Sequence, residues 1–386
     1  MRILLGVPEF PPHHIGWWGA VFEALAHEYV KLWHEVMVVY GNYDTRTWFE
    51  KIKEYFKDGI YFVQVPLIPT PGFLPFLKTV LPTLPYHLGK IMNIIKIFAP
   101  DISHLHWYGL LFINQLAKIL VSNNFPYIYT LHGAPVSADK KWWIIKMVYN
   151  FYKKTRGKSI LENACDITAV SQYTIDNFSE FLPYRDKIRV VHNWIYPEEF
   201  EKRVWFNIYD RFNLSKDATI YLSIGRIEWL KGFDQFIKMI PLLVKSWVDA
   251  RYFIAGRDNG FKEELDKLIR ELKIEDRIFY LGFISWDDKL SALQNSDFLI
   301  VSSFVENFPA VPLEAMSSWI IPIVNNAWGM IEQVKNKKNW IIVDFSNKDN
   351  YKKLLNIWIL SQDLRCSVEK YKRKYIAEEY LAYKRK

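Results

Sequence analysis

The chain has 386 residues, enough for two domains that each bury a hydrophobic core. Half of its residues are hydrophobic and 24% are charged, which excludes an intrinsically disordered chain, and two cysteines are too few for a disulfide scaffold. The formal net charge of +8 suits a nucleic acid, an anionic membrane surface or a phosphate-bearing substrate as partner. Charge alone does not choose among these three.

The amino-terminal segment MRILLGVPEF predicts a β-strand rather than a signal peptide, because its apolar run is short and prolines follow it. No stretch of the sequence reaches the roughly 18 uninterrupted apolar residues of a membrane-spanning helix. The two cysteines, Cys165 and Cys366, lie far apart, as is common in a reducing compartment. We therefore expect a cytoplasmic protein.

Short β-branched runs alternate with amphipathic helical patterns along the chain. The strands predicted for a first sheet are residues 2–7, 35–40, 61–65, 127–132, 166–170 and 188–192. Those predicted for a second sheet are residues 219–225, 250–256, 277–282, 297–303 and 320–325. Helical patterns cover residues 20–32, 262–273, 286–295 and the final segment 347–386. Such alternation predicts an α/β fold with doubly wound parallel sheets.

A change of composition marks the boundary between the two sheets. The segment HNWIYPEEFEKRV, residues 192–204, loses strand character and gains charge and proline. We predict an N-terminal domain of residues 1–194 and a C-terminal domain of residues 195–360. Residues 361–386 are predicted to form a C-terminal helix and basic tail that pack back toward the N-terminal domain.

In open α/β sheets, ligands bind beyond the carboxyl ends of the strands, so the loops that follow strands carry the most information. No G-x-G-x-x-G motif follows a predicted strand, which does not favour a dinucleotide site. The segment SIGRIEWLKGFDQF places Arg226 and Lys231 between a strand and a helix. Two cations there can hold a diphosphate, but the same pattern also fits two solvated basic residues.

The segment ENFPAVPLEAM follows another predicted strand and begins a helix at Pro312. Free backbone amides at Ala310 and Val311 favour an anion at this helix start. Glu314 falls in the first helical turn, where it can simply complement the helix dipole. Glu306 lies in the preceding loop, where that explanation does not apply.

Three histidines lie near neighbouring strand ends of the first sheet. The segment YTLHGAP places His132 directly after a strand, and HLHWYG places His104 and His106 near another strand end. Single histidines are more often structural than catalytic. A metal site is not expected, because no carboxylate or cysteine stands at ligand spacing nearby and no D-x-D pair is present.

Nine segments, in their order and spacing, together resemble the retaining, metal-independent GT-B glycosyltransferases that carry the E-x7-E motif (glycosyl transferases group 1, family 4 type). The segments are PPHHIGWWGAVFEALAHEYVKLWHEV, TLHG, ENACDITAVS, VVHNW, SIGRIEWLKGFD, FIAG, YLGFIS, ENFPAVPLEAM and WGMIEQV. The resemblance implies a GT-B fold, in which two Rossmann-like domains face a cleft that holds the active site. It also implies transfer of a hexose from a nucleoside diphosphate sugar to a saccharide or lipid-linked acceptor, in cell-surface glycan, lipopolysaccharide or glycolipid synthesis.

The resemblance assigns roles to individual residues of this chain. Arg226 and Lys231 would stabilise the donor diphosphate electrostatically, in place of a metal ion. Glu306 would contact the donor sugar, and Glu314 would hydrogen-bond the ribose hydroxyls. The remaining assigned residues are Gly16 near the phosphates, His132 facing the sugar and acceptor, Ile284 near the base, and Ala310 and Val311 at the donor.

The resemblance also implies a mechanism in which the leaving phosphate oxygen helps to deprotonate the acceptor on the same face of the sugar. A glycosidase-like pair of carboxylates, acting as nucleophile and acid, is not expected. We expect neither a cofactor nor a metal ion.

Two segments suggest how a lipid-linked acceptor is reached. Residues 139–159, DKKWWIIKMVYNFYKKTRGKS, mix apolar residues at helical spacing with seven Lys or Arg, which fits a helix lying on an anionic membrane and equally a core helix with basic flanks. Residues 66–85, PLIPTPGFLPFLKTVLPTLP, fit an acceptor channel or an interfacial loop. Peripheral attachment to the inner face of the membrane is therefore an expectation.

The chain departs from the family pattern by carrying tryptophan where the family usually has glycine. These positions are Trp17, Trp33, Trp194, Trp319, Trp328 and Trp340. The chain holds 16 glycines and 16 tryptophans, whereas ordinary usage of about 7% predicts roughly 27 glycines. We hypothesise that many of these tryptophans are glycines, misread because UGA was translated under the wrong genetic code. The alternative is a divergent protein with an unusually aromatic surface or a decayed site.

Two other functions stay open. A nucleic-acid-modifying glucosyltransferase is suggested only by the net charge, and no basic and aromatic platform supports nucleic-acid binding. A catalytically inactive GT-B module that binds a sugar nucleotide or a partner protein is favoured if the tryptophans at positions 17 and 319 are genuine.

Overall fold

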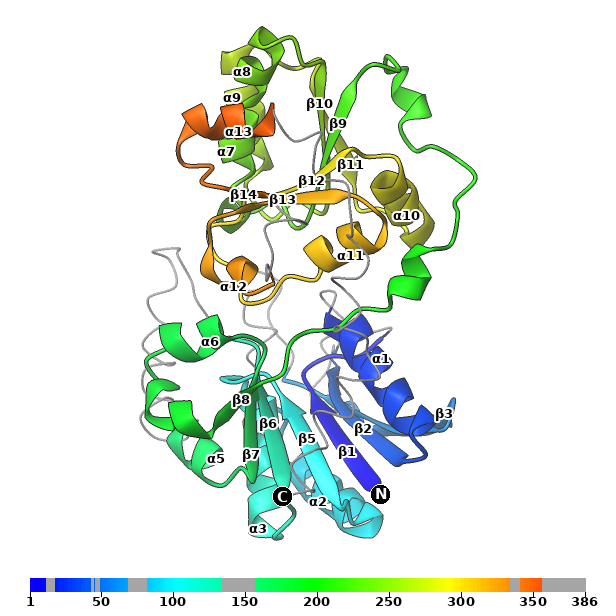
Figure 1. The fold of residues 1–386 in the computed structure, drawn as a ribbon. Helices are drawn as coiled ribbons and strands as arrows, with labels where there is room; N and C mark the ends of the chain where they lie inside the picture. The colour runs from blue at the N-terminus through cyan, green and yellow to red at the C-terminus, as the bar shows by residue number, and fades with distance from the viewer. Residues whose placement is uncertain are drawn as a thin grey trace. The chain divides into compact units, whose positions relative to one another are not determined.

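The computed structural model describes residues 1–11, 18–42, 45, 49–68, 82–133, 157–333 and 341–355. The chain divides into two compact units, of which the first contains Met1–His192 and the second begins at Asn193. Each unit has its own sheet (Figure 1). The predicted C-terminal helix and tail, residues 361–386, lie outside the described residues.

Within the described residues, unit 1 contains an eight-stranded sheet in the order β3-β4-β2-β1-β5-β6-β7-β8. Its strands are β1 (Arg2–Val7), β2 (Glu35–Asn42), β3 (Lys53–Lys57), β4 (Ile60–Pro66), β5 (Ile102–His106), β6 (Tyr127–Leu131), β7 (Asp166–Ala169) and β8 (Ile188–Val190). Its helices are α1 (Trp18–Lys31), α2 (Pro85–Phe98), α3 (Leu111–Ser122), α5 (Lys158–Glu162), α6 (Gln172–Asn177) and the 3₁₀ helix η4 (Leu182–Lys187). The strand order reverses between β1 and β5.

Helices cover both faces of this sheet, because its strands are apolar on both sides. Helix α1 presents Phe22 and Tyr29, seven residues apart, to the face that carries the histidines of β5. Helices α2 and α3 cover the opposite face, where Ile95 and Leu116 pack in one cluster with Leu4 and Val39 of the strands. The six strands predicted for this unit are all present.

Strand β5 was not among the predicted strands, and neither was β3, which pairs with β4 in the antiparallel direction. All five of its residues are exposed, so it lacks the apolar run that marks the other strands. The turn between the two strands is Asp58-Gly59, with φ angles of 50° and 80°. Asp-Gly is a strong signal for a two-residue hairpin turn, and it is the local signal from which this edge pair could have been predicted.

Unit 2 contains, among its described residues, a six-stranded parallel sheet in the order β11-β10-β9-β12-β13-β14. Its strands are β9 (Thr219–Ile224), β10 (Ala250–Ala255), β11 (Ile278–Gly282), β12 (Phe298–Val301), β13 (Ile321–Asn325) and β14 (Ile341–Val343). Its α-helices are α7 (Phe233–Ile237), α8 (Ile240–Lys245), α9 (Lys262–Leu272), α10 (Trp286–Gln294), α11 (Val311–Ser317), α12 (Trp328–Ile331) and α13 (Tyr351–Leu354). Its 3₁₀ helices are η5 (Pro197–Phe200), η6 (Asp210–Phe212), η7 (Trp229–Lys231) and η8 (Lys348–Asn350).

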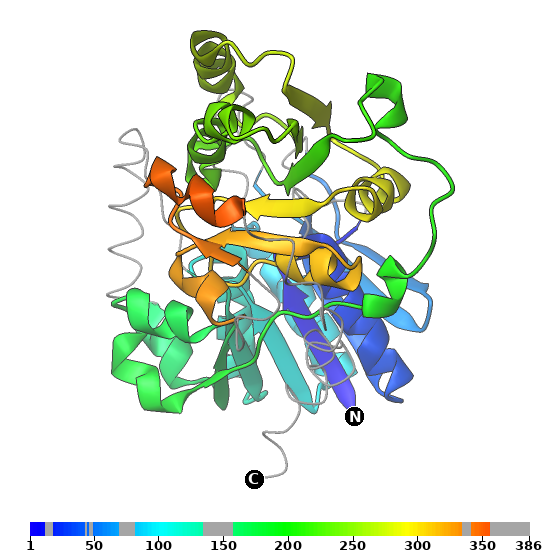
Figure 2. The same ribbon diagram turned by 45° about the horizontal axis from the view of Figure 1, so that its top comes forward.

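The central strands of the unit 2 sheet are β9 and β12. Strands β10 and β11 follow outward from β9 on one side, and β13 and β14 follow outward from β12 on the other. Helices α7, α8, α9 and α13 lie together on the left of the strands in both views, and α10 lies on the right (Figures 1 and 2). The core on the α7–α9 face joins Phe236, Leu243 and Leu265 to Tyr252 and Ile300 of the strands. The order reverses between β9 and β12, and such switch points are where open α/β sheets bind ligands.

In the part of the chain that the structure describes, three helix ends carry a tryptophan in the left-handed backbone region. The φ angles are 63° at Trp33, 65° at Trp247 and 65° at Trp319. Their side chains are 93%, 98% and 60% exposed. Bulky L-residues are strained in this region by roughly 1–2 kcal/mol, whereas glycine adopts it freely. Packing of the indole does not offset that strain at Trp33 and Trp247.

Backbone hydrogen bonds fix this conformation. At the end of α11 the amide of Trp319 bonds the carbonyl of Met316 at 3.1 Å, and the next amide bonds the carbonyl of Ala315 at 2.9 Å. The same pair of bonds closes α1 and α8. This is the Schellman motif, in which the left-handed residue is usually glycine.

The other positions of the glycine hypothesis differ. Trp17 and Trp340 lie outside the described residues, as does the side chain of Trp328. The strain argument fails at Trp194, which is 4% exposed and is not in the left-handed region. It extends instead to Trp107, with a φ of 80°, and to Trp247. The hypothesis that the natural residues are glycines stays a prediction.

Replacing Trp247 with glycine should raise the free energy of unfolding by about 1 kcal/mol, because it removes left-handed strain without removing packing. Denaturant titration measures this change. Trp205→Gly is the matched control, since Trp205 is 92% exposed but is not in the left-handed region. A Trp247→Gly variant no more stable than Trp205→Gly would contradict the strain argument, and UGG codons at positions 33, 247 and 319 would contradict misreading.

Candidate active site

An ion pair joins the loops that follow β9 and β12, at the switch point of unit 2. Lys231 lies at the end of η7, and Glu306 lies in the loop before α11. Their side chains meet at 2.6 Å between Nζ and Oε1, and they are 24% and 15% exposed. The structure therefore brings together two residues predicted for the site from separate motifs, 75 positions apart.

Backbone contacts hold these two loops in register. The amide of Phe304 donates to the carbonyl of Leu230 at 2.9 Å, and the hydroxyl of Ser302 donates to the carbonyl of Lys231 at 3.1 Å. Gly232 has a φ of 61°, and a Cβ atom there would collide with the carbonyl oxygen of Ser302. The glycine that follows Lys231 is thus required by both its backbone conformation and the close approach of the second loop.

Helix α12 supports the other side of the Glu306 loop. A Cβ atom on Gly329 would collide with the backbone carbonyls of Glu306 and Asn307. The backbone of α12 therefore lies directly against the loop, and Glu306 is held between η7 and α12.

Arg226 lies two residues after the end of β9, and its side chain is 65% exposed. It pairs with Glu228 at 3.0 Å, and Glu228 accepts a hydrogen bond from Asn259 at 2.9 Å. Asn259, in the loop after β10, therefore holds Glu228 in place. Glu228 in turn orients the guanidinium of Arg226, which stays accessible to an anion.

Glu314 lies in α11 and pairs with Lys289 of α10 at 2.6 Å. The two side chains are 13% and 20% exposed. Ala310 precedes α11 and Val311 is its first residue, as predicted from Pro312. Ile284 follows β11 and is partly buried.

Gly16 lies outside the described residues, so its predicted place near the phosphates is not part of the described structure. Sequence reasoning did not identify Glu228, Asn259 or Lys289. Only Glu228, two residues after Arg226, carried a local signal.

Three histidines form a buried cluster in unit 1. His104 and His106 are on one face of β5, and His132 follows β6 directly. A nitrogen–nitrogen hydrogen bond of 2.9 Å joins Nδ1 of His106 to Nε2 of His132. His104 contacts the hydroxyl of Thr130 at 2.6 Å and that of Tyr29 at 3.0 Å. All three rings are at most 2% exposed.

Burial keeps this cluster neutral. It lowers the pKa of His132 to about 3, and together with His132 and Arg189 it lowers the pKa of His104 to about 3. The pKa of His106 is also lowered well below its usual value by burial and by its two neighbours. Neutral rings can act as hydrogen-bond donors or acceptors but carry no charge for a phosphate.

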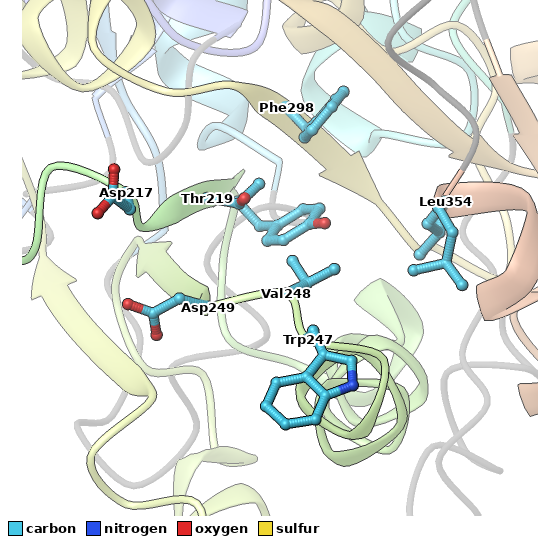
Figure 3. Close-up of a pocket in the computed structure, with 9 residues that line it drawn as sticks. Asp217, Thr219, Trp247, Val248, Asp249, Phe298 and Leu354 are labelled. Carbon is cyan, nitrogen blue, oxygen red and sulfur yellow. The ribbon is translucent and has the colours of Figure 1, made fainter.

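A separate pocket of about 200 Å³ lies at the opposite end of the unit 2 sheet (Figure 3). It opens at the amino ends of the strands, next to Thr219 of β9 and Phe298 of β12. Its charged lining residues are Asp217 and Asp249, and Asp249 pairs with Arg251 at 3.0 Å. Two carboxylates do not favour a diphosphate, so this pocket is not a candidate donor site.

Within the described ranges, no group of three or more His, Cys, Asp or Glu is placed to hold a metal ion. None of the helices in the described part of the chain is both long and apolar enough to cross a membrane.

The buried histidines predict a loss of stability in acid. Below pH 6.5 the unfolded chain binds protons that the folded cluster does not bind, so the free energy of unfolding falls with pH down to about pH 3. The expected loss between pH 7 and pH 5 is about 2 kcal/mol for each histidine. Urea titrations at both pH values should show this loss reduced by about a third in His104→Asn. NMR signals of these three rings that titrate near pH 6.5 would contradict the prediction.

Comparison with known proteins identifies two consecutive family matches. Residues 19–199 match the model described as Glycosyltransferase Family 4, and residues 207–375 match the model described as Glycosyl transferases group 1. An uncharacterized glycosyltransferase of Methanocaldococcus jannaschii is 25% identical over 365 residues, which cover 91% of this chain and 87% of that protein.

Solved structures share the fold. Sucrose-phosphate synthase from Thermosynechococcus elongatus superposes with a TM-score of 0.73 at 15% identity. The superposition covers 100% of this chain and 98% of the chain of that enzyme. The Anabaena protein HepE, in complex with UDP and glucose, superposes with a TM-score of 0.70 at 14% identity. The superposition covers 99% of this chain and 98% of the HepE chain. The two family matches leave out only residues 1–18, 200–206 and 376–386. The chain belongs to the group 1 and family 4 glycosyltransferases of the GT-B fold.

Proposed function

We propose that this protein transfers a hexose from a nucleoside diphosphate sugar to a saccharide or lipid-linked acceptor, with retention of configuration and without a metal ion. The observation that carries the proposal is the Lys231–Glu306 ion pair at the switch point of unit 2, with Arg226 exposed beside the same strand end. A cation and a carboxylate at one strand edge suit a substrate in which a diphosphate adjoins a sugar.

Lys231 can bind the diphosphate and Glu306 together. An ammonium group has three N–H donors, and one of them points at Oε1 of Glu306. The others can bind phosphate oxygens, with Arg226 as a second cation. Charge that develops on the leaving diphosphate is then stabilised by fixed cations, the role that a metal ion has in other transferases.

The proposed reaction exchanges one bond at the anomeric carbon of the sugar for another. The bond from that carbon to the diphosphate oxygen breaks, and a bond to the acceptor oxygen forms on the same face. The acceptor proton passes to the leaving phosphate oxygen, so the products are a glycoside and a nucleoside diphosphate. Glu306 holds the sugar and, paired with Lys231, does not serve as an acid.

The remaining assignments extend this proposal. Glu314 binds the ribose hydroxyls, Ile284 and the amides at Ala310 and Val311 contact the donor, and His132 contacts the sugar and acceptor. HepE, which has the same fold, binds UDP and glucose, and this supports a nucleotide-sugar donor for the present chain.

We further propose a role in cell-surface glycan or glycolipid synthesis, with peripheral attachment to the membrane. The basic stretch 139–159 suggests this, and its residues 139–156 lie outside the described residues. Sedimentation with anionic liposomes tests the attachment, and equal recovery with and without liposomes counts against it.

Lys231→Ala and Glu306→Ala should each reduce sugar transfer at least about 100-fold, because each removes a group that binds donor at the reacting bond. The measurement is release of nucleoside diphosphate from a panel of nucleotide sugars. Both variants should melt within a few degrees of the parent, since a single partly exposed pair contributes about 1 kcal/mol or less to stability.

Lys262→Ala is the matched control for these variants. Lys262 forms an ion pair of the same 2.6 Å length with Asp266, on α9 of the same unit. Near-normal turnover in Lys231→Ala or Glu306→Ala would overturn the assignment of the site.

A further inference from the structure

The Lys289–Glu314 pair differs from the lysine–carboxylate pairs that form within a single α-helix of unit 2. Lys238–Asp234 and Lys262–Asp266 each join residues four apart on one helix, and those lysines are 50% and 40% exposed. Lys289 is 20% exposed and joins α10 to α11, 25 residues along the chain. An intrahelical pair can form on any solvated helix, whereas this pair requires the two helices to meet.

The elements around the pair fix the lysine. Helix α10 begins at a Ser285 cap, whose hydroxyl accepts from the amide of Asp288 at 3.1 Å, so the first turn that carries Lys289 is well defined. The ammonium also lies over the indole of Trp286, at 5.5 Å from the ring centroid. Lys289 is thus restrained from two sides, by the ring beneath it and by the carboxylate in front of it.

On the other side of the pair, Glu314 is anchored by its backbone. Its amide donates to the carbonyl of Ala310 at 3.0 Å, and it follows Pro312 in the first turn of α11. Its side chain still has three rotatable bonds, and a glutamate in one fixed rotamer loses up to about 2 kcal/mol of conformational entropy. An ammonium at 2.6 Å selects one orientation before any ligand arrives.

We propose that Lys289 is a positioning residue that holds the Glu314 carboxylate in the orientation needed to accept hydrogen bonds from the ribose hydroxyls of the donor. This inference rests on the proposed function. An ionised carboxylate has about four acceptor sites. Lys289 forms its ion pair with Oε2, so the acceptor sites of Oε1 are left for the two hydroxyls of a ribose. Lys289 acts through Glu314 and does not touch the nucleotide.

The test is a thermodynamic double-mutant cycle, in which Lys289 is changed in the protein and the ribose hydroxyls are removed from the ligand. Isothermal titration first compares UDP, GDP and ADP, and the tightest of them is then compared with its 2′,3′-dideoxy analogue and with inorganic diphosphate. The parent protein should bind the dideoxy analogue about 100-fold more weakly, since two hydrogen bonds to a charged group are lost. Lys289→Met should weaken the full nucleotide about 10-fold and leave the dideoxy analogue and inorganic diphosphate unchanged.

Three further variants make the result specific. Glu314→Gln should lower the discrimination between nucleotide and dideoxy analogue at least as far as Lys289→Met does, and Lys289→Arg should restore part of it. Lys262→Met, which breaks the exposed pair on α9, should change none of the three affinities. Melting temperatures of all variants exclude a general loss of structure.

Two results overturn the inference while leaving the proposed function intact. If Lys289→Met weakens binding of all three ligands equally, the lysine binds the phosphates. If Lys289→Met leaves the preference for the nucleotide over its dideoxy analogue unchanged while Glu314→Gln lowers it, the lysine has no role in positioning Glu314. A parent protein that binds none of the nucleoside diphosphates would overturn the proposed function itself.

Discussion

The site of unit 2 depends on the close approach of two backbone loops, at Gly232 and Ser302. Neither Lys231 nor Glu306 would face the other if the loops after β9 and β12 were separated by the width of a side chain. Three features maintain that approach: a glycine without a Cβ atom, the amide of Phe304 bonded to Leu230, and the Ser302 hydroxyl bonded to the Lys231 carbonyl. A motif spread over 75 residues of sequence thereby becomes one ion pair.

Each of the three cations near the proposed donor site has its own carboxylate: Arg226 pairs with Glu228, Lys231 with Glu306 and Lys289 with Glu314. A partly buried charge without a partner lowers the stability of the fold. Pairing with a carboxylate therefore stabilises these cations when no ligand is bound. Their exposure differs, from 65% for Arg226 to 20% for Lys289. The exposed cation is suited to meet a diphosphate, and the sheltered one is suited to orient its partner.

Much of this arrangement could be predicted from the sequence, and the rest could not for physical reasons. Most strands of the two sheets are buried, so their β-branched runs identified them. The runs missed three strands: β5, whose sequence ISHLH holds two histidines, β14, which is only three residues long, and the fully exposed β3, for which the local signal is the Asp-Gly turn. Arg226 and Lys231 belong to the motif that follows β9, and Glu306 and Glu314 belong to the motif that follows β12 and begins α11. Lys289 carries no local mark, because its partner is set by how α10 crosses toward α11. Part of the burial that lowers the histidine pKa values likewise comes from Phe22 and Tyr29 of α1, a helix that is far from β5 and β6 in the chain.

The left-handed helix ends show that the conformation is determined by hydrogen bonding and not by the residue that occupies it. The same two backbone bonds occur after α3 and α9, where Asn124 and Lys273 have φ angles of 56°. Asparagine tolerates this region because its short side chain bonds locally. In Lys273 only the Cβ atom is crowded by the backbone, and the rest of the side chain is in solvent. An indole brings the same crowding together with a large apolar surface, and at Trp33 and Trp247 nearly all of that surface faces water. Such a residue neither relieves strain nor gains burial, and glycine at these positions would accommodate the same backbone without either cost.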